Sequence, residues 1–339
     1  MSKLDKESHI RYIASLDSKR DDYEYWLSEH LRLNGVYWGL TALCVLDSKT
    51  TFNRSEIIAF VRSCWDFKAG AFAAFPGHDA HVLTTLSGIQ ILAIYDALDV
   101  LLEKPGDGRD NSDSSNSSNM KTQCVAFLRS NQLSDGSFQG DRFGEVDTRF
   151  VYAALNALSI LGQLTPEVVD PAVEFVKLCY NFDGGFGLSP GAESHAAMSL
   201  TCIAALAVVN KLDALSPEQM ENIAWWLCER QVPEGGLNGR PSKQPDVCYS
   251  WWVLSSLAII GKRDWIDFDK LREFILHSQD PKRGGISDRP GNEVDVFHTC
   301  FGVTGLSLMG KDNLVEIDPV YCMPASVTQT FKKYPYHEQ

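Results

Sequence analysis

The sequence has no long hydrophobic segment and no excess of positive charge. No apolar run reaches the roughly 18 residues that a membrane-spanning helix needs, and the first 26 residues are rich in charged side chains. The 339 residues carry a formal net charge of −13. This charge argues against non-specific binding to nucleic acid or to an anionic membrane surface, because both need a cationic face. Anionic ligands would need a local basic site.

The sequence also lacks closely spaced cysteine pairs. Its nine cysteines are scattered, odd in number and never arranged as CxxC. That pattern is typical of buried thiols in a reducing compartment rather than of disulfides. We therefore expect a cytoplasmic protein without a transmembrane segment.

What the sequence does contain is an internal repeat of about 50 residues. The first glycines of four similar turns are spaced by 48, 51 and 49 residues, and a second set of helix stop signals has the same three spacings. A shared period in two independent marks indicates a repeat architecture. Earlier stretches at 68–72 and 33–43 extend the series to five or six units. The turns are SDGSF (134–138), FDGGF (182–186), PEGGL (233–237) and KRGGI (282–286), and the stop signals are Gly162, Asn210, Gly261 and Gly310.

Each unit predicts a helical hairpin. An amphipathic segment precedes the glycine turn, and a segment that is apolar on nearly every face follows it, so the first should be an outer helix and the second an inner helix. We expect an all-α fold, an α/α toroid of about six hairpins, in a single domain spanning residues 1–339. Residues 104–120 are rich in Ser, Asn, Asp and Gly, which predicts a disordered insertion between two units.

A polar, ionisable residue recurs where each inner helix should begin. The positions are His81, Asp147, His195, Asp246 and Asp295. Backbone N–H groups are unpaired at a helix N-terminus and the helix dipole is positive there. Capping alone would account for Asp147, because Asp is a good N-cap residue.

The neighbourhood of Asp246 predicts a metal site. Cys248 follows two residues later, and His298 lies near the equivalent place in the next unit. Ends of adjacent helices can bring such side chains to one point. A carboxylate, a thiolate and an imidazole suit Zn²⁺, and three protein ligands leave the fourth tetrahedral position open for catalysis.

Basic and phenolic residues surround these ligands. Arg240 and Lys243 lie just before them, His195 opens the preceding inner helix, and Tyr249 follows Cys248. Such groups near helix N-termini suit a phosphate or diphosphate, although a solvated loop explains Arg240 and Lys243 almost equally well. Aromatic residues of the inner helices are candidates to line the interior: Phe150, Trp252, Phe297 and Phe301.

These strings resemble the β subunits of protein prenyltransferases, most closely the Rab geranylgeranyltransferase (type II) branch. The resemblance covers essentially the whole chain outside residues 104–120. Its most specific pieces are DDYEYWLSEHLRLNGVYWGL, GEVDTRF, NFDGGFG with PGAESHA, WWLCERQ, GGLNGRPSKQPDVCYSWWVL and DRPGNEVDVFHT. The resemblance implies an α/α barrel of six hairpins, an α-subunit partner, a catalytic Zn²⁺ and a geranylgeranyl diphosphate pocket.

The resemblance also implies roles for individual residues. The zinc ligands would be Asp246, Cys248 and His298, the set that spacing alone indicates. Asp288 matches a position that binds Mg²⁺ in related farnesyltransferases, so Mg²⁺ is a second candidate ion. Asn34 stands where similar enzymes commonly place a small residue at the pocket floor, which leaves lipid-length preference open. The diphosphate would contact His195, Arg240, Lys243 and Tyr249, and the isoprenoid Arg149, Trp252, Phe297, Leu86 and Asn34.

The implied reaction is attack of a cysteine thiolate on C1 of geranylgeranyl diphosphate. The acceptors would be C-terminal cysteines of Rab GTPases presented by an escort protein. A farnesyltransferase or type I geranylgeranyltransferase β subunit is an alternative with the same chemistry. A terpene cyclase is less compatible, because its acidic DxDD motif is absent from the sequence. A non-catalytic toroidal binding module without metal is a further alternative.

Overall fold

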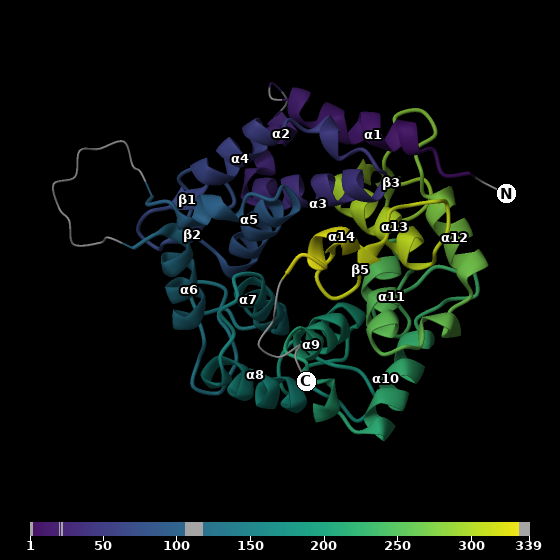
Figure 1. Cartoon of the computed structure of the whole chain (residues 1–339). Helices are drawn as coiled ribbons and strands as arrows, with labels where there is room; N and C mark the ends of the chain where they lie inside the picture. The colour runs from purple at the N-terminus through teal and green to yellow at the C-terminus, as the bar shows by residue number, and fades with distance from the viewer. Residues whose placement is uncertain (1–2, 20, 22, 106–117, 332–339) are drawn as a thin grey trace.

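Six inner helices form a closed ring (Figure 1). The computed structural model describes residues 3–19, 21, 23–105 and 118–331. Each inner helix contacts the next one along the chain, and the last contacts the first. The predicted α/α toroid of six hairpins is confirmed. The inner helices are α3 (Arg32–Val45), α5 (Val82–Ile94), α7 (Thr148–Ile160), α9 (Ala196–Val208), α11 (Tyr249–Ile259) and α13 (Val296–Leu308).

An amphipathic outer helix lies behind each inner one. The inner helices are buried on almost every side; α5, for example, buries all its residues except Leu83. The outer helices bury one stripe only, as expected for helices with one face in solvent. They are α1 (Lys6–Ser15), α4 (Arg54–Ser63), α6 (Met120–Ser130), α8 (Pro166–Leu178), α10 (Pro217–Cys228) and α12 (Phe268–His277). Short elements connect the hairpins: α2 (Tyr23–Leu27), η1 (Leu16–Lys19), η2 (Glu29–Leu31), η3 (Lys49–Thr51), η4 (Leu98–Leu102), η5 (Leu212–Ala214) and η6 (Arg263–Trp265).

The repeated glycines let each turn approach the next outer helix. Gly136, Gly184, Gly235 and Gly284 all have positive φ. A Cβ at each would meet a backbone carbonyl of the following outer helix. For Gly284 that helix is α1, because the carbonyl belongs to Ser8. The first helix of the chain therefore occupies the sixth outer position, next to the last turn of the series.

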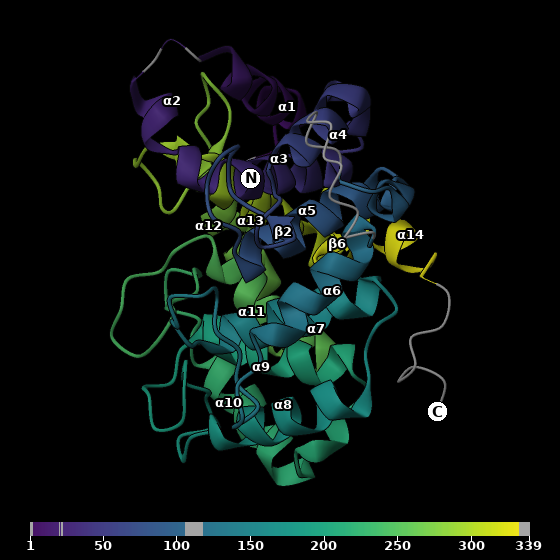
Figure 2. The same ribbon diagram turned by 90° about the vertical axis from the view of Figure 1, so that its left-hand side faces the viewer.

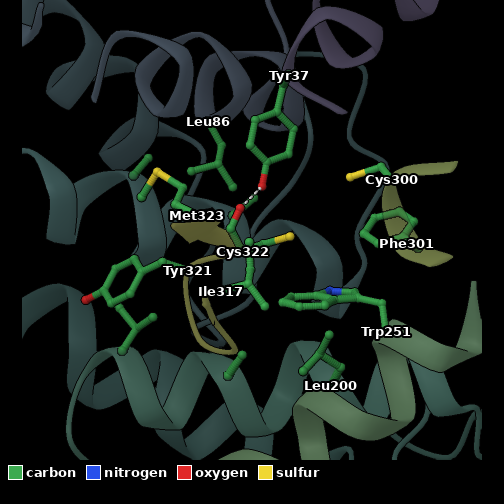
Figure 3. Close-up of a cluster of buried hydrophobic side chains, with 14 of the residues drawn as sticks. Tyr37, Leu86, Leu200, Trp251, Cys300, Phe301, Ile317, Tyr321, Cys322 and Met323 are labelled. Atoms are coloured by element: carbon green, nitrogen blue, oxygen red, sulfur yellow. Dashed lines mark hydrogen bonds between the residues drawn. The ribbon is translucent and has the colours of Figure 1, made fainter. Parts of the chain in front are cut away.

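A hairpin near the C-terminus enters the ring, which the sequence did not reveal. β5 (Ile317–Asp318) pairs antiparallel with β6 (Met323–Pro324), and α14 (Ala325–Thr328) follows. Side chains of three inner helices hold its backbone: Tyr37 Oη donates to the Cys322 carbonyl (2.7 Å), Gln90 Nε2 to the Tyr321 carbonyl (2.8 Å) and Tyr152 Oη to the Val320 carbonyl (2.6 Å). Figure 3 shows Cys322 and Met323 packed among Tyr37, Leu86 and Trp251. The other strand pairs are β1 (Trp65–Asp66) with β2 (Ala71–Phe72) and β3 (Ile286–Ser287) with β4 (Val294–Asp295).

The predicted insertion at 104–120 lies mostly outside the described residues, at 106–117. The predicted boundary at residue 120 overlaps the start of α6, which begins at Met120. Asn119 caps α6 by accepting from the Thr122 N–H, and Met120, the first helical residue, is buried. Within the described ranges, no helix combines the length and the apolar character needed to cross a bilayer.

Candidate metal centre and diphosphate site

All six inner helices begin at the same end of the ring, which we call the N-terminal end. Figure 2 shows the long loops before α9 and α11 on one side of the molecule and α14 on the other. His81, Asp147, His195 and Asp295 each cap an inner helix with a side-chain atom. Asp246 lies two residues before Cys248, the N-cap of α11, and its Oδ1 accepts from the Cys248 N–H at 2.7 Å. The recurring ionisable residues therefore gather at one end of the ring.

Asp246, Cys248 and His298 come together at this end. One ligand atom from each lies within 4.8 Å of the others. His298 Nε2 is 3.2 Å from Asp246 Oδ1. A carboxylate oxygen, a thiol sulfur and an imidazole nitrogen form a donor set that suits Zn²⁺, and three such ligands leave one tetrahedral position for a substrate. The residues present thus fit a catalytic zinc ion.

The protonation of the three groups reflects their burial and mutual contacts. Burial and the nearby Asp246 carboxylate raise the pKa of the Cys248 thiol well above its usual range. Burial alone would raise the pKa of Asp246, but hydrogen bonds from His298 and Cys248 lower it. Burial alone would lower the pKa of His298, but hydrogen bonds to Asp246 and Asp295 raise it to about 9. Without metal, an imidazolium and a carboxylate hold the cluster together, and binding of a cation would displace protons.

Asp295 orients His298, a role that sequence reasoning missed. Its Oδ1 accepts from the His298 backbone N–H (2.8 Å), and its Oδ2 lies 2.6 Å from His298 Nδ1. Because Nδ1 is engaged by the carboxylate, Nε2 is the nitrogen presented to a metal. The signal was available: Asp295 stands at the recurrent capping position, three residues before His298.

His195 and Tyr249 form a second polar group at the N-terminal end. His195 Nδ1 accepts from the Ala197 N–H at 3.2 Å, so its Nε2 carries the proton in the neutral ring. That Nε2 lies 3.2 Å from Tyr249 Oη. Tyr249 can therefore accept from His195 and direct its own O–H elsewhere. A Cβ on Gly239 would lie 2.5 Å from Tyr249 Cζ and 2.8 Å from His195 Nε2, so only glycine leaves room for this pair.

Arg240 lies near enough to His195 and Tyr249 to act on them electrostatically, whereas Lys243 shows no such interaction with them. Burial, followed by the charge of Arg240, lowers the pKa of His195, and Arg240 also acts electrostatically on Tyr249. The Arg240 guanidinium pairs with Glu193. Lys243 is exposed and lines a surface pocket of about 750 Å³ beside α12.

The residues expected near the isoprenoid lie at different depths. Trp252 and Phe297 are half-buried and both contact Phe301, with ring centroids 5.0 and 4.7 Å away. Leu86 is buried deeper, in the cluster of Figure 3. Asn34 donates to Ser87 Oγ at 2.9 Å and lines a pocket of about 560 Å³.

Two predicted residues are already engaged by charged neighbours. Arg149 pairs with Asp147 at 2.7 Å. The Asp288 carboxylate, the candidate for Mg²⁺, accepts from Arg289 Nε and from Asn292 Nδ2, both at 2.8 Å. To bind a cation, Asp288 would have to release these partners.

Comparison with known proteins gives the family. The prenyltransferase alpha-alpha toroid domain matches residues 4–323. The geranylgeranyl transferase type-2 subunit beta of Saccharomyces cerevisiae is 72% identical over 98% of this chain and 97% of that protein. The chain belongs to the geranylgeranyl transferase type-2 β-subunit family. The Candida albicans member is 54% identical over 97% of this chain and 95% of that protein.

Membership of the type-2 β-subunit family makes the chain a protein prenyltransferase subunit and decides against the farnesyl and type I alternatives. The solved structure of Candida albicans protein geranylgeranyltransferase-I complexed with GGPP has a TM-score of 0.81 and covers 98% of this chain and 99% of that chain. A Scytonema type II terpene cyclase reaches 0.60, covering 89% of this chain and 96% of that chain. At 22% and 14% identity these two structures show the shared fold alone.

Proposed function

We propose that this single-domain chain is the catalytic β subunit of a zinc-dependent transferase that moves a geranylgeranyl group onto Rab GTPases. It acts in the cytoplasm with an α subunit, and an escort protein presents the Rab C-terminus. The relatives named as type-2 β subunits support the partner and the acceptor. The nine unpaired thiols fit a reducing compartment. The observation that carries the proposal is the Asp246, Cys248 and His298 cluster at the N-terminal end of the ring.

Asp246, Cys248 and His298 would hold the zinc ion, and Asp295 would keep His298 Nε2 directed toward it. When bound, zinc would lower the pKa of a substrate cysteine at its fourth position, which in water is about 8.5. The sulfur of that cysteine would form a bond to C1 of geranylgeranyl diphosphate as the C1–O bond breaks. The electron pair of that bond leaves with diphosphate, and the thiol proton passes to solvent.

His195, Arg240 and Tyr249 would bind the diphosphate and stabilise the charge that grows on it. They combine a phenol, a guanidinium and an imidazole at the N-termini of α9 and α11, where the helix dipoles also favour an anion. Arg240 would exchange Glu193 for the diphosphate. Lys243, in the same loop, would assist from farther out.

The isoprenoid would lie against the half-buried aromatic side chains below this group. Trp252 and Phe297 offer the nearest apolar surface, with Arg149 on the opposite wall, Leu86 deeper in the ring and Asn34 near the start of α3. The solved structure of Candida albicans protein geranylgeranyltransferase-I is complexed with GGPP. Asp288 stays the candidate for Mg²⁺ and would act beside the diphosphate after releasing Arg289.

The test combines metal analysis with donor and acceptor competition. The chain purified with an α subunit should contain one zinc per heterodimer, prefer geranylgeranyl over farnesyl diphosphate and modify a Rab–escort complex far better than a short cysteine peptide. Cys248→Ala and His298→Ala should lose the zinc. Cys179→Ala, which removes another buried thiol, should keep it. Absence of zinc from the wild-type heterodimer would refute the proposal.

A further inference from the structure

The N-terminal helix α1 packs on the segment that ends at Asp295, the residue that orients His298. The Asp5 N–H donates to Gln279 Oε1 (3.1 Å), and the Gly285 N–H donates to His9 Nδ1 (2.9 Å). Tyr12 Oη donates to the Val294 carbonyl at 3.1 Å. All three partners belong to residues 279–295, which contain the β3–β4 hairpin.

Tyr12 occupies a place that recurs in the repeat. In three turns, an aromatic residue of the following outer helix lies against the second glycine, together with the residue before the recurrent ionisable residue (His195, Asp246 or Asp295). For Gly185 these are Trp226 and Ser194, for Gly236 Phe274 and Pro245, and for Gly285 Tyr12 and Val294. Phe274 shows that an unsubstituted phenyl ring fits this place. The hydroxyl of Tyr12 is therefore an addition to a ring that packing alone already requires.

The Tyr12 hydroxyl contacts the backbone next to the residue that orients His298. Asp246 would bind the metal directly. Asp295 would act indirectly, through its hydrogen bonds to the backbone N–H and to Nδ1 of His298. Small backbone shifts at Val294–Asp295 would turn the imidazole away from the other two ligands. The Tyr12 hydrogen bond ends on the carbonyl of Val294, the residue directly before Asp295.

We propose that Tyr12 is a positioning residue for the metal centre, which holds the Val294–Asp295 backbone so that Asp295 presents His298 Nε2 to the ion. This inference rests on the proposed zinc site. It assigns to α1, a helix that contributes no ligand, part of the metal affinity of the protein. The Tyr12 side chain is buried, so the bond does not exchange freely with water.

The experiment is a zinc-affinity measurement by chelator competition on the full chain purified with an α subunit. Tyr12→Phe should weaken zinc about three- to tenfold, less than the roughly 10- to 100-fold typical of losing a direct outer-shell partner, as expected for Asp295→Asn. Co²⁺-substituted Tyr12→Phe should also show an altered visible spectrum at equal metal occupancy, because the angle of His298 changes.

A matched control separates this role from general stability. Tyr152→Phe removes a comparable hydrogen bond, to the Val320 carbonyl, on the side of the ring that carries no metal ligand. It should lower thermal stability and leave zinc affinity unchanged. Equal zinc affinity in Tyr12→Phe and wild type would overturn the inference while leaving the zinc site intact, whereas failure of wild type to bind zinc would overturn the proposed function itself.

A double variant gives the decisive result. If Tyr12 acts through Asp295, adding Tyr12→Phe to Asp295→Asn should weaken zinc no further than Asp295→Asn does alone. Two effects that simply multiply would show that Tyr12 acts through the overall fold, and the positioning role would be wrong.

Discussion

Replacing Gly239 with alanine should separate diphosphate binding from the rest of lipid binding. The added Cβ would stand 2.5 Å from Tyr249 Cζ and 2.8 Å from His195 Nε2. Both distances are well inside ordinary carbon contact, so the phenol and the imidazole must each move by roughly 1 Å. One charge-assisted hydrogen bond to the diphosphate is worth about 1.5–3 kcal/mol. We expect the dissociation constant for geranylgeranyl diphosphate to rise about 10- to 100-fold, since each 1.4 kcal/mol is a factor of ten.

The assay compares binding of geranylgeranyl diphosphate with binding of geranylgeraniol, which lacks the diphosphate. The matched control is Gly140→Ala, at the equivalent glycine of an earlier repeat, where a Cβ would press on His81 and on Phe150 instead of a tyrosine. Gly140→Ala should lower the free energy of unfolding by a similar amount but weaken the binding of both lipids equally. A Gly239→Ala protein that also weakens both lipids equally would refute the role given to His195 and Tyr249.

Three further outcomes follow from the geometry. Arg240→Ala should weaken geranylgeranyl diphosphate about tenfold, and Lys243→Ala clearly less, in the same binding assay; a larger loss in Lys243→Ala would contradict their placement. Burial lowers the pKa of His9 below its usual 6.5, so the unfolded chain binds the proton more tightly. Wild type should therefore lose stability as the pH falls through about 6.5, by at most about 1.4 kcal/mol per pH unit from this group, and His9→Gln should show a shallower decline in urea unfolding. Gly284→Ala should lower stability by about 1–3 kcal/mol more than Gly77→Ala, since both have positive φ but only Gly284 abuts α1; equal melting temperatures would count against that contact.

The repeat made most of the fold predictable. Glycine spacing located the turns, and the apolar character of the second helix in each unit assigned it to the inside. These signals are local in sequence, so they can be recognised from the sequence alone. The position of α1 was not predictable in this way, because its partner turn at Gly284 lies more than 270 residues away. The C-terminal hairpin was missed for a similar reason: its carbonyls are held by Tyr37, Gln90 and Tyr152, and none of these forms a motif with it.

The cluster of candidate metal ligands was predictable because their positions repeat. Asp246 lies at the recurrent helix start, and His298 lies close to the same place one unit later. Spacing could not show that Asp295 orients His298, nor that Arg240 pairs with Glu193 while Lys243 lines a pocket beside α12. Those properties depend on side-chain direction, which sequence period alone does not determine.

The contact between α1 and residues 279–295 sets an order of events during synthesis. Ser8, His9 and Tyr12 leave the ribosome well before the backbone they pack against, which is made about 280 residues later. At about 5–20 residues per second, α1 waits roughly 15–60 s for its partner. Over that interval the face of α1 that will contact residues 279–295 is not covered by them, and transiently exposed surface of this kind is what chaperones protect.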